Sequence, residues 1–451
     1  MKDYLKFIKR VKGIKNRTSP LKALLIGFML FNSCNDKISL PENEVEISGS
    51  QMDTTTSVAT SLSSYSLVDL EKIASDLEKQ GYDVSSTMQQ IREQNPVNPK
   101  ARTTALIIHS KKIVVKLPNP ANPLVMMDVS AVLLYPRLHA LLHQKQLIVA
   151  TPGTYVINKL APSNLFGNLW TLKGSDLIDG IAIAPYLLNA GLQPVLIIDY
   201  PGFGSSHGQL QHPYLDQKVI AVSSIRLIRA AQKTLNQDFV KLASDDLIIT
   251  GYSQGAFSAT AIAREIETNR EHKDLSIKLI SVGGIPANLT KVLDYSIAKD
   301  YAEIPYFFPY GLWGYKKVRY PNIPVAKIMK EPYYTMSFND FNGYGAINYP
   351  QKLSAIYTAD FLTNYKTSNT YSEVRRALDE NNIKPWVNKA PLFMLHGTAD
   401  VTVEFKQAKS FALKMNAAGG NVHFAEYPGL NHYSGAIAYV AAFNLQLALA
   451  K

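Results

Sequence analysis

The chain has 451 residues, of which 46% are hydrophobic and 18% charged, and this balance excludes a disordered or fibrous protein. Its net charge of +11 is concentrated in residues 1–33, where eight Lys and Arg residues accompany one Asp and give a net charge of +7. The remaining +4, the difference between +11 and +7, is ordinary for a body of this size and argues against a nucleic-acid-binding protein.

An export signal is predicted at the start of the chain. Behind the basic residues lies an apolar stretch, 23–31, that is far shorter than the about 20 residues a membrane-spanning helix needs. It leads into Phe-Asn-Ser-Cys over 31–34, which resembles a loose lipobox, and Cys34 is the single cysteine of the chain. We therefore predict a lipoprotein-type signal peptide over 1–33 and lipidation of Cys34, with an ordinary secretory signal as the alternative. The predicted location is a bacterial cell envelope, on its periplasmic or outer side, where the lipid anchors the protein to a membrane.

A polar tether and a mixed segment are expected next. Residues 34–66 are rich in Ser and Thr and predict a solvated tether. Apolar residues at helical spacing predict a helix between Ser66 and Gln94. Two β-rich segments, 104–117 and 124–134, are separated by Pro-Asn-Pro and predict an antiparallel pair.

Short apolar strands and helices alternate from residue 147 on. The expected strands are 147–150, 195–198, 247–250, 278–282, 392–395 and 422–425. The expected helices are 219–235, 256–268, 406–417 and 434–449. Strands that are apolar throughout are typical of a parallel sheet covered by helices on both faces, so the pattern predicts an α/β domain, which we place at 67–451.

One interval interrupts this alternation. About a hundred residues separate the strand at 278–282 from the strand at 392–395, whereas a crossover between parallel strands needs about a dozen. We predict an inserted cap subdomain over about 285–385. Its segment 301–349 holds 14 aromatic residues among 49, which favours an apolar substrate surface. Aromatic side chains that only pack the cap, or that stack on sugar rings, are the alternatives.

A serine lies between two glycines at a strand-to-helix transition. The sequence Gly-Tyr-Ser-Gln-Gly over 251–255 follows the expected strand at 247–250 and precedes a helix, which is the setting of a nucleophile elbow. The glycines allow a sharp turn that exposes the hydroxyl of Ser253. The backbone N–H of Gln254, in the first helical turn, then points to where an oxyanion would form.

The base and the acid are expected downstream, each in a loop after a strand. In chain order the acid comes first, and Asp400 follows the strand at 392–395, while His432 follows the last strand. The other candidates fit this order less well: His423 lies within a strand, His396 precedes a turn, and His207, His212 and Asp199 precede the serine. We predict the triad Ser253, Asp400 and His432, and a turn-capping role for Asp199.

A second oxyanion donor is expected in the loop after the strand at 147–150. Either Gly153 or Thr154 could supply the backbone N–H, and we favour Thr154. A simple turn that closes the strand is the alternative.

With these residues the sequence resembles the α/β-hydrolase superfamily over roughly 100–451, and most of all its secretory lipase branch of the fungal lipase-A type. Besides the elbow, the similar segments are Asp-Tyr-Pro-Gly-Phe-Gly at 199–204, His-Pro-Tyr-Leu at 212–215, the helix end at 226–231, Gly-Gly-Ile-Pro-Ala-Asn-Leu at 283–289, and a large cap before the acid. The resemblance implies an α/β-hydrolase fold with a mostly parallel sheet. Two features depart from the branch: Pro152 stands where a His-Gly-Thr motif has its histidine, and a single cysteine excludes the branch's disulfides.

The sequence therefore predicts a serine carboxylic-ester hydrolase of the lipase or esterase type. Its expected partner is a small acyl ester, with no metal, no cofactor and no obligatory protein partner. An oligopeptidase-type serine peptidase and a carbohydrate esterase are the alternatives. A binding protein on an inactive hydrolase scaffold is a third interpretation, and the complete triad in proper order argues against it.

Overall fold

The computed structural model describes residues 57–94, 106–136, 146–168, 184–240, 242, 244, 246–340 and 348–449. The predicted signal peptide, Cys34 and the tether up to residue 56 lie outside these ranges. No helix within them is long and apolar enough to cross a membrane.

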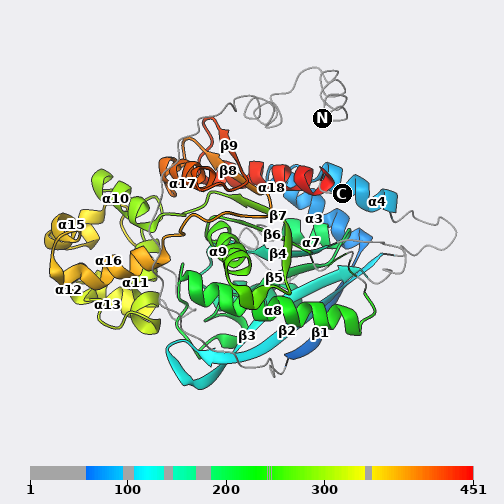
Figure 1. Ribbon diagram of the computed structural model, residues 1–451, viewed down its shortest axis with the longest axis horizontal. Helices are drawn as coiled ribbons and strands as arrows, with labels where there is room; N and C mark the ends of the chain where they lie inside the picture. Colours follow the sequence, from blue (N-terminus) through cyan, green and yellow to red (C-terminus); the bar gives the residue numbers. More distant parts are fainter. Residues whose placement is uncertain are drawn as a thin grey trace.

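A sheet of nine strands forms the centre of the described molecule, in the order β1-β2-β3-β5-β4-β6-β7-β8-β9 (Figure 1). The strands are β1 (Ser57–Ser66), β2 (Ile107–Asn119), β3 (Asn122–Pro136), β4 (Leu147–Thr151), β5 (Val195–Ile198), β6 (Asp246–Tyr252), β7 (Ser276–Gly283), β8 (Leu392–Gly397) and β9 (Val422–Tyr427). The strands from β5 through β4 to β9 pair in parallel, and β1, β2 and β3 pair antiparallel. The predicted α/β class with a mostly parallel sheet and the antiparallel pair are confirmed.

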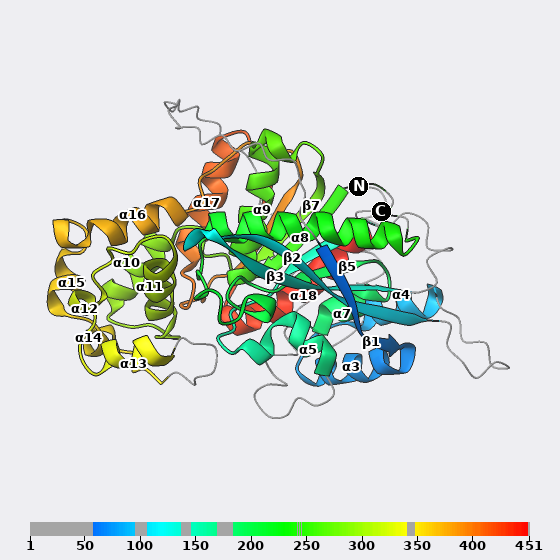
Figure 2. The same ribbon diagram turned by 90° about the horizontal axis from the view of Figure 1, so that it is seen from below.

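Helices cover both faces of this sheet, as the apolar strands require. In Figure 2, α8 (Gln217–Gln237), α9 (Gln254–Thr268) and α17 (Phe405–Ala417) lie on one face. The opposite face carries α3 (Leu67–Lys79), α5 (Pro162–Asn168), α7 (Ala184–Ala190) and α18 (His432–Leu449), with α4 (Ser85–Gln94) at its side (Figure 2). Short 3₁₀ turns are η1 (Asn158–Leu160), η3 (Gly204–Ser206), η4 (Arg270–His272) and η5 (Asn369–Tyr371).

A separate group of helices lies beyond one end of the sheet, at the left of Figure 1. It contains α10 (Leu289–Lys299), α11 (Phe307–Val318), α12 (Val325–Ile328), α13 (Tyr333–Asp340), α14 (Leu353–Ile356), α15 (Ala359–Asn364) and α16 (Ser372–Asn381). All of them lie between β7 and β8, in the interval where the sequence predicts an insertion. We refer to residues 285–385 as the cap.

The tether prediction is wrong for its last ten residues. Residues 57–66 form β1, which pairs antiparallel with β2 from Ser57 opposite Val115 to Ser66 opposite Ile107. Most β1 side chains are exposed or only partly buried, so backbone pairing at the sheet edge holds the strand. Such an edge strand tolerates Ser and Thr and leaves no apolar alternation in the sequence.

The single helix expected between Ser66 and Gln94 is two helices. The chain reverses after α3 at Gly81, whose φ of +91° lies in the left-handed region that glycine adopts without strain. Both helices bury apolar side chains against the body. The helical spacing of apolar residues is therefore present on both sides of the turn, and the spacing alone does not reveal the break.

Candidate active site

The nucleophile elbow forms between β6 and α9. Ser253 has φ 59° and ψ −122°, a strained conformation for a residue with a side chain. The elbow needs its two glycines, because a Cβ on Gly251 would overlap the backbone of Gly255, and a Cβ on Gly255 would overlap the carbonyl oxygen of Thr151. This close packing holds the strain and presents the hydroxyl of Ser253 at the carboxyl edge of the sheet.

Ser253, His432 and Asp400 are brought together by three different elements. The Oγ of Ser253 lies 2.9 Å from Nε2 of His432, and Nδ1 of His432 lies 2.7 Å from Oδ2 of Asp400. The three residues are 8%, 6% and 3% exposed, respectively. A carboxylate only accepts hydrogen bonds, so Nδ1 carries the imidazole proton and Nε2 is free to accept the serine proton.

Hydrogen bonds on both sides keep Asp400 ionised. Its Oδ1 accepts the backbone N–H of Val403 at 2.8 Å, and its Oδ2 lies 3.2 Å from Nε2 of His396 as well as close to His432. Burial by itself would raise the pKa of Asp400, but the hydrogen bonds from His396 and His432 outweigh it and lower the pKa to about 2. The carboxylate is therefore charged throughout the range in which a histidine acts as a base.

The loop at 151–154 lies against the first turn of α9. Thr151 Oγ1 is 2.7 Å from the carbonyl oxygen of Gly255 and 3.0 Å from that of Thr250. The hydroxyl of Thr154 is 3.1 Å from the hydroxyl of Tyr214, which is buried. The structure thus holds the loop that carries Thr154 beside the turn that begins with Gln254.

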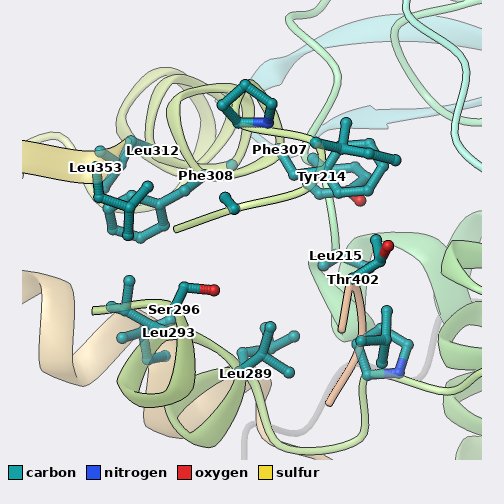
Figure 3. A pocket seen from close by; sticks show the side chains of 18 of the residues that line it. Tyr214, Leu215, Leu289, Leu293, Ser296, Phe307, Phe308, Leu312, Leu353 and Thr402 are labelled. Atoms are coloured by element: carbon teal, nitrogen blue, oxygen red, sulfur yellow. The ribbon is translucent and has the colours of Figure 1, made fainter. Parts of the chain in front are cut away.

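A pocket opens from Ser253 into the cap. In Figure 3, side chains of α11 and α14 face those of α10 across an open space, with Tyr214, Leu215 and Thr402 at one end. The labelled lining residues are Tyr214, Leu215, Leu289, Leu293, Ser296, Phe307, Phe308, Leu312, Leu353 and Thr402. The lining is largely aliphatic and aromatic, and the carboxylate of Glu303, which accepts a hydrogen bond from the hydroxyl of Thr402, is its one charged group among the described residues.

The family model of the secretory lipases matches residues 175–443, more than half of the chain. The chain belongs to the secretory lipase family. Family membership makes it a carboxylic-ester hydrolase and an exported protein, as the sequence predicts. A sequence comparison with curated proteins found no match.

Solved structures share the fold of this secretory lipase. The esterase LipA of Xanthomonas oryzae has a TM-score of 0.64 and 17% identity, over 87% of this chain and 96% of that chain. Candida antarctica lipase A has a TM-score of 0.55 and 16% identity, over 83% and 76%. A protein from Legionella pneumophila has a TM-score of 0.70 and 20% identity, over 87% and 97%. The predicted α/β-hydrolase fold is confirmed.

Three supporting residues of the lipase were missed in the sequence. His396, which precedes a turn and fits the predicted triad order less well, is fully buried, and its Nε2 lies 2.8 Å from the carbonyl oxygen of Val403 in the loop that carries Asp400. Tyr252 donates its hydroxyl proton to the backbone carbonyl of His432 at 2.6 Å. Only the spacing of His396, four residues before Asp400, was available as a signal in the sequence.

His212 is the third of these residues, and it holds the side chain of Gln254. Its Nδ1 donates to the carbonyl oxygen of Pro201 at 2.7 Å, and its Nε2 accepts from the amide of Gln254 at 2.9 Å. Burial lowers the pKa of His212 to about 4, so the ring is neutral and able to accept. His212 therefore positions the residue after the nucleophile and takes no part in the triad geometry.

Asp199 also lies outside the triad. It is fully buried, and its Oδ1 accepts the backbone N–H of Ser163 in the first turn of α5 at 2.9 Å. Its Oδ2 accepts a hydrogen bond from the hydroxyl of Ser130 on β3. The carboxylate thus ties a helix start to the sheet.

Proposed function

We propose that this secretory lipase cleaves carboxylic esters through an acyl-enzyme on Ser253. Ser253 Oγ attacks the acyl carbonyl while Nε2 of His432 takes its proton and then returns it to the leaving alcohol. Asp400 orients the imidazole and stabilises its charged form, and water releases the acid by the same route. The observation that carries this proposal is the pair of contacts beside an apolar pocket, 2.9 Å from Ser253 Oγ to His432 Nε2 and 2.7 Å from His432 Nδ1 to Asp400 Oδ2.

The proposed oxyanion donors are the backbone N–H groups of Gln254 and Thr154. The strained elbow and the His212 contact support the first, and the packing of the 151–154 loop against α9 supports the second. Donors held in place before the reaction stabilise the developing charge without reorganisation.

The lining of the pocket favours an acyl chain of medium to long length. LipA of Xanthomonas oryzae is a rice cell wall degrading esterase, so a carbohydrate ester is the second candidate. The aromatic side chains of this pocket, however, lie mostly among leucines and other aliphatic groups. Hydrogen-bonding side chains such as Ser296 and Glu303 are the minority of the lining, which favours an acyl chain over a sugar. A hydrolysis panel of short and long acyl esters, acetylated sugars and peptide amides distinguishes the lipase, carbohydrate-esterase and peptidase functions.

Narrowing the pocket should shorten the preferred acyl chain. Ser296 projects into the open space from α10 (Figure 3), and Ser296→Phe would exclude the far end of a long chain. Each methylene kept out of the pocket costs about 0.8 kcal/mol, so excluding about three lowers kcat/KM for a long-chain ester about 50-fold. Rates on an acetyl ester should stay within about twofold, because the triad is untouched.

The matched control for the pocket variant is Ala298→Phe, which places the same ring at an exposed position of the same helix. It should leave the chain-length profile of kcat/KM unchanged. Equal losses on short and long esters in Ser296→Phe would show that the pocket does not hold the acyl chain.

We further propose that residues 1–33 are a lipoprotein signal peptide and that Cys34 carries the lipid. Residues 34–56 would then tether the enzyme to a membrane of a bacterial cell envelope, with a role in lipid catabolism. The position of the single cysteine at the end of the apolar stretch supports this, together with the exported character of the family.

Replacing Cys34 with alanine should release the protein from membranes. Stable anchoring needs acyl chains, and Cys34 is the residue proposed to carry them. Fractionation should move Cys34→Ala from the membrane pellet to the soluble fraction, while Ser33→Ala, which keeps a small residue beside the cysteine, should stay in the pellet. An intact mass with an unmodified Cys34 would contradict the lipoprotein assignment.

A further inference from the structure

The hairpin between β2 and β3 ends in an exposed apolar tip. Leu124, Val125 and Met126 are 96%, 50% and 53% exposed, although they follow one another in a strand. Burial of the strand begins with Met127, which is fully buried, and continues through most of the rest of β3. The segment 117–127 contains no charged residue. Three consecutive exposed apolar side chains are unfavourable in water unless another surface covers them.

The register places this tip at the edge of the sheet where Ser253 lies. Ala131 of β3 pairs with Ile198 at the carboxyl end of β5, so residues 122–130 of β3 extend beyond that end. Ser253 follows the carboxyl end of β6, which belongs to the same parallel set. In Figure 1 and Figure 2 the hairpin reaches toward the side of the molecule where the cap lies.

The N-terminal part of the chain joins the body at this same edge. Ser57, the first residue of β1, is opposite Val115, which is in turn opposite Val129 of β3. The 23 residues from Cys34 to Ser57 span at most about 80 Å when extended. A lipid on Cys34 would therefore keep the body near the membrane through an attachment at the edge where the hairpin lies.

We propose that the hairpin tip, residues 122–126, inserts into the surface of a lipid bilayer and turns the Ser253 edge of the sheet toward it. This inference rests on the proposed function, because it makes the bilayer the place where the enzyme meets its esters. A protein partner fits the tip less well, since a stable protein interface buries about 800 Å² per partner and three aliphatic side chains do not supply that area. Small uncharged aliphatic tips suit the boundary between lipid headgroups and acyl chains.

The test compares esters in a bilayer with esters in solution, in the full chain carrying Cys34→Ala so that lipidation does not mask the tip. The added change Leu124→Ser/Val125→Ser should lower the rate on a long-chain ester embedded in phosphatidylcholine vesicles at least about tenfold. The rate on a monomeric short-chain ester should remain within about twofold, which also shows that the variant is folded. The control is Phe239→Ser, because Phe239 is 92% exposed and follows α8 beside Asp238, whose partners Lys111 and Tyr135 mark the opposite edge of the sheet.

Leu124→Trp gives a readout that does not depend on activity. Adding vesicles should shift its tryptophan emission to shorter wavelength, and brominated lipids should quench it, relative to the parent chain. An unchanged emission, or equal vesicle losses in the tip variant and in Phe239→Ser, would overturn the inference. Failure of every variant and of the parent to cleave either ester would instead refute the proposed function and leave the fluorescence result to decide the docking.

Discussion

We expect Ser253→Ala and His432→Ala each to lower kcat on a soluble ester by about a million-fold, the scale observed when one member of a serine triad is removed. This corresponds to about 8 kcal/mol of transition-state stabilisation. The loss is large because Ser253 and His432 act as one unit across the 2.9 Å contact, so removing either one leaves no activated nucleophile. Initial rates on a chromogenic short-chain ester measure the loss.

Matched variants separate catalysis from folding in this experiment. Ser223→Ala removes a buried serine hydroxyl of α8 that bonds the helix backbone, and His423→Ala removes an exposed histidine of β9. Both should keep the parent rate within about threefold. A fluorophosphonate should label the parent at Ser253 alone, and labelling at another residue, or full turnover by Ser253→Ala, would refute the assignment.

The second large effect is expected at the acid. Asp400→Asn should lower kcat about 10⁴-fold, because a neutral amide stabilises neither the required tautomer nor the charged form of His432. Asp199→Asn is the comparison, since Asp199 is, among the described residues, the other buried acid that directly follows a strand, and this variant should lose less than about tenfold in kcat. The reverse order of losses would identify Asp199 as the acid.

The substitution Asp400→Asn should also lower the stability of the folded enzyme by an amount that depends on pH. The folded pKa of Asp400 lies near 2, below its ordinary value of 3.8, so its charge stabilises the folded state above about pH 4. That contribution, about 2 kcal/mol from a shift of this size, is lost as pH falls from about 4 toward 2. The difference in Tm between the parent and Asp400→Asn should therefore be largest above pH 4 and shrink below it. A Tm difference that is constant from pH 6 to pH 2 would contradict the assigned ionisation.

The parts of this enzyme that could be predicted are those encoded in short stretches of sequence. The strand 147–150 is β4 to within one residue, because an apolar run between turn residues has few other structures available. The elbow was readable for the same reason, since two glycines around a serine between strand and helix describe one local geometry. Asp400 and His432 followed from the order of the strands, because all parallel strands end at the same edge of the sheet.

The pairing of the edge strand β1 with β2 has no comparable signal in the sequence. β1 is polar and mostly exposed, and its backbone hydrogen bonds to β2 are formed with residues about fifty positions away. Composition alone therefore suggested a tether there. The residues that support the site could not be predicted for a related reason, because their hydrogen bonds join distant positions. His212 and Gln254 are 42 positions apart, and Tyr252 and His432 are 180 positions apart. Each of these contacts depends on where two distant loops meet above the sheet.

By itself, the sequence determined the alternation of elements and the strained serine, because both depend on neighbours within a few residues. It also determined the candidate acid and base, because the order of the strands places the loops after them at one edge of the sheet. Only the tertiary structure decided which groups sustain that triad. The charge of Asp400 depends on His396 being enclosed beside it, and burial has no marker in the local pattern. The direction of the apolar hairpin tip likewise follows from the pairing of β3 with β5, a contact between segments about sixty residues apart. Long-range packing decides which side chains are buried, how polar their surroundings are and where each side chain points. These properties decide whether the candidate residues form a site.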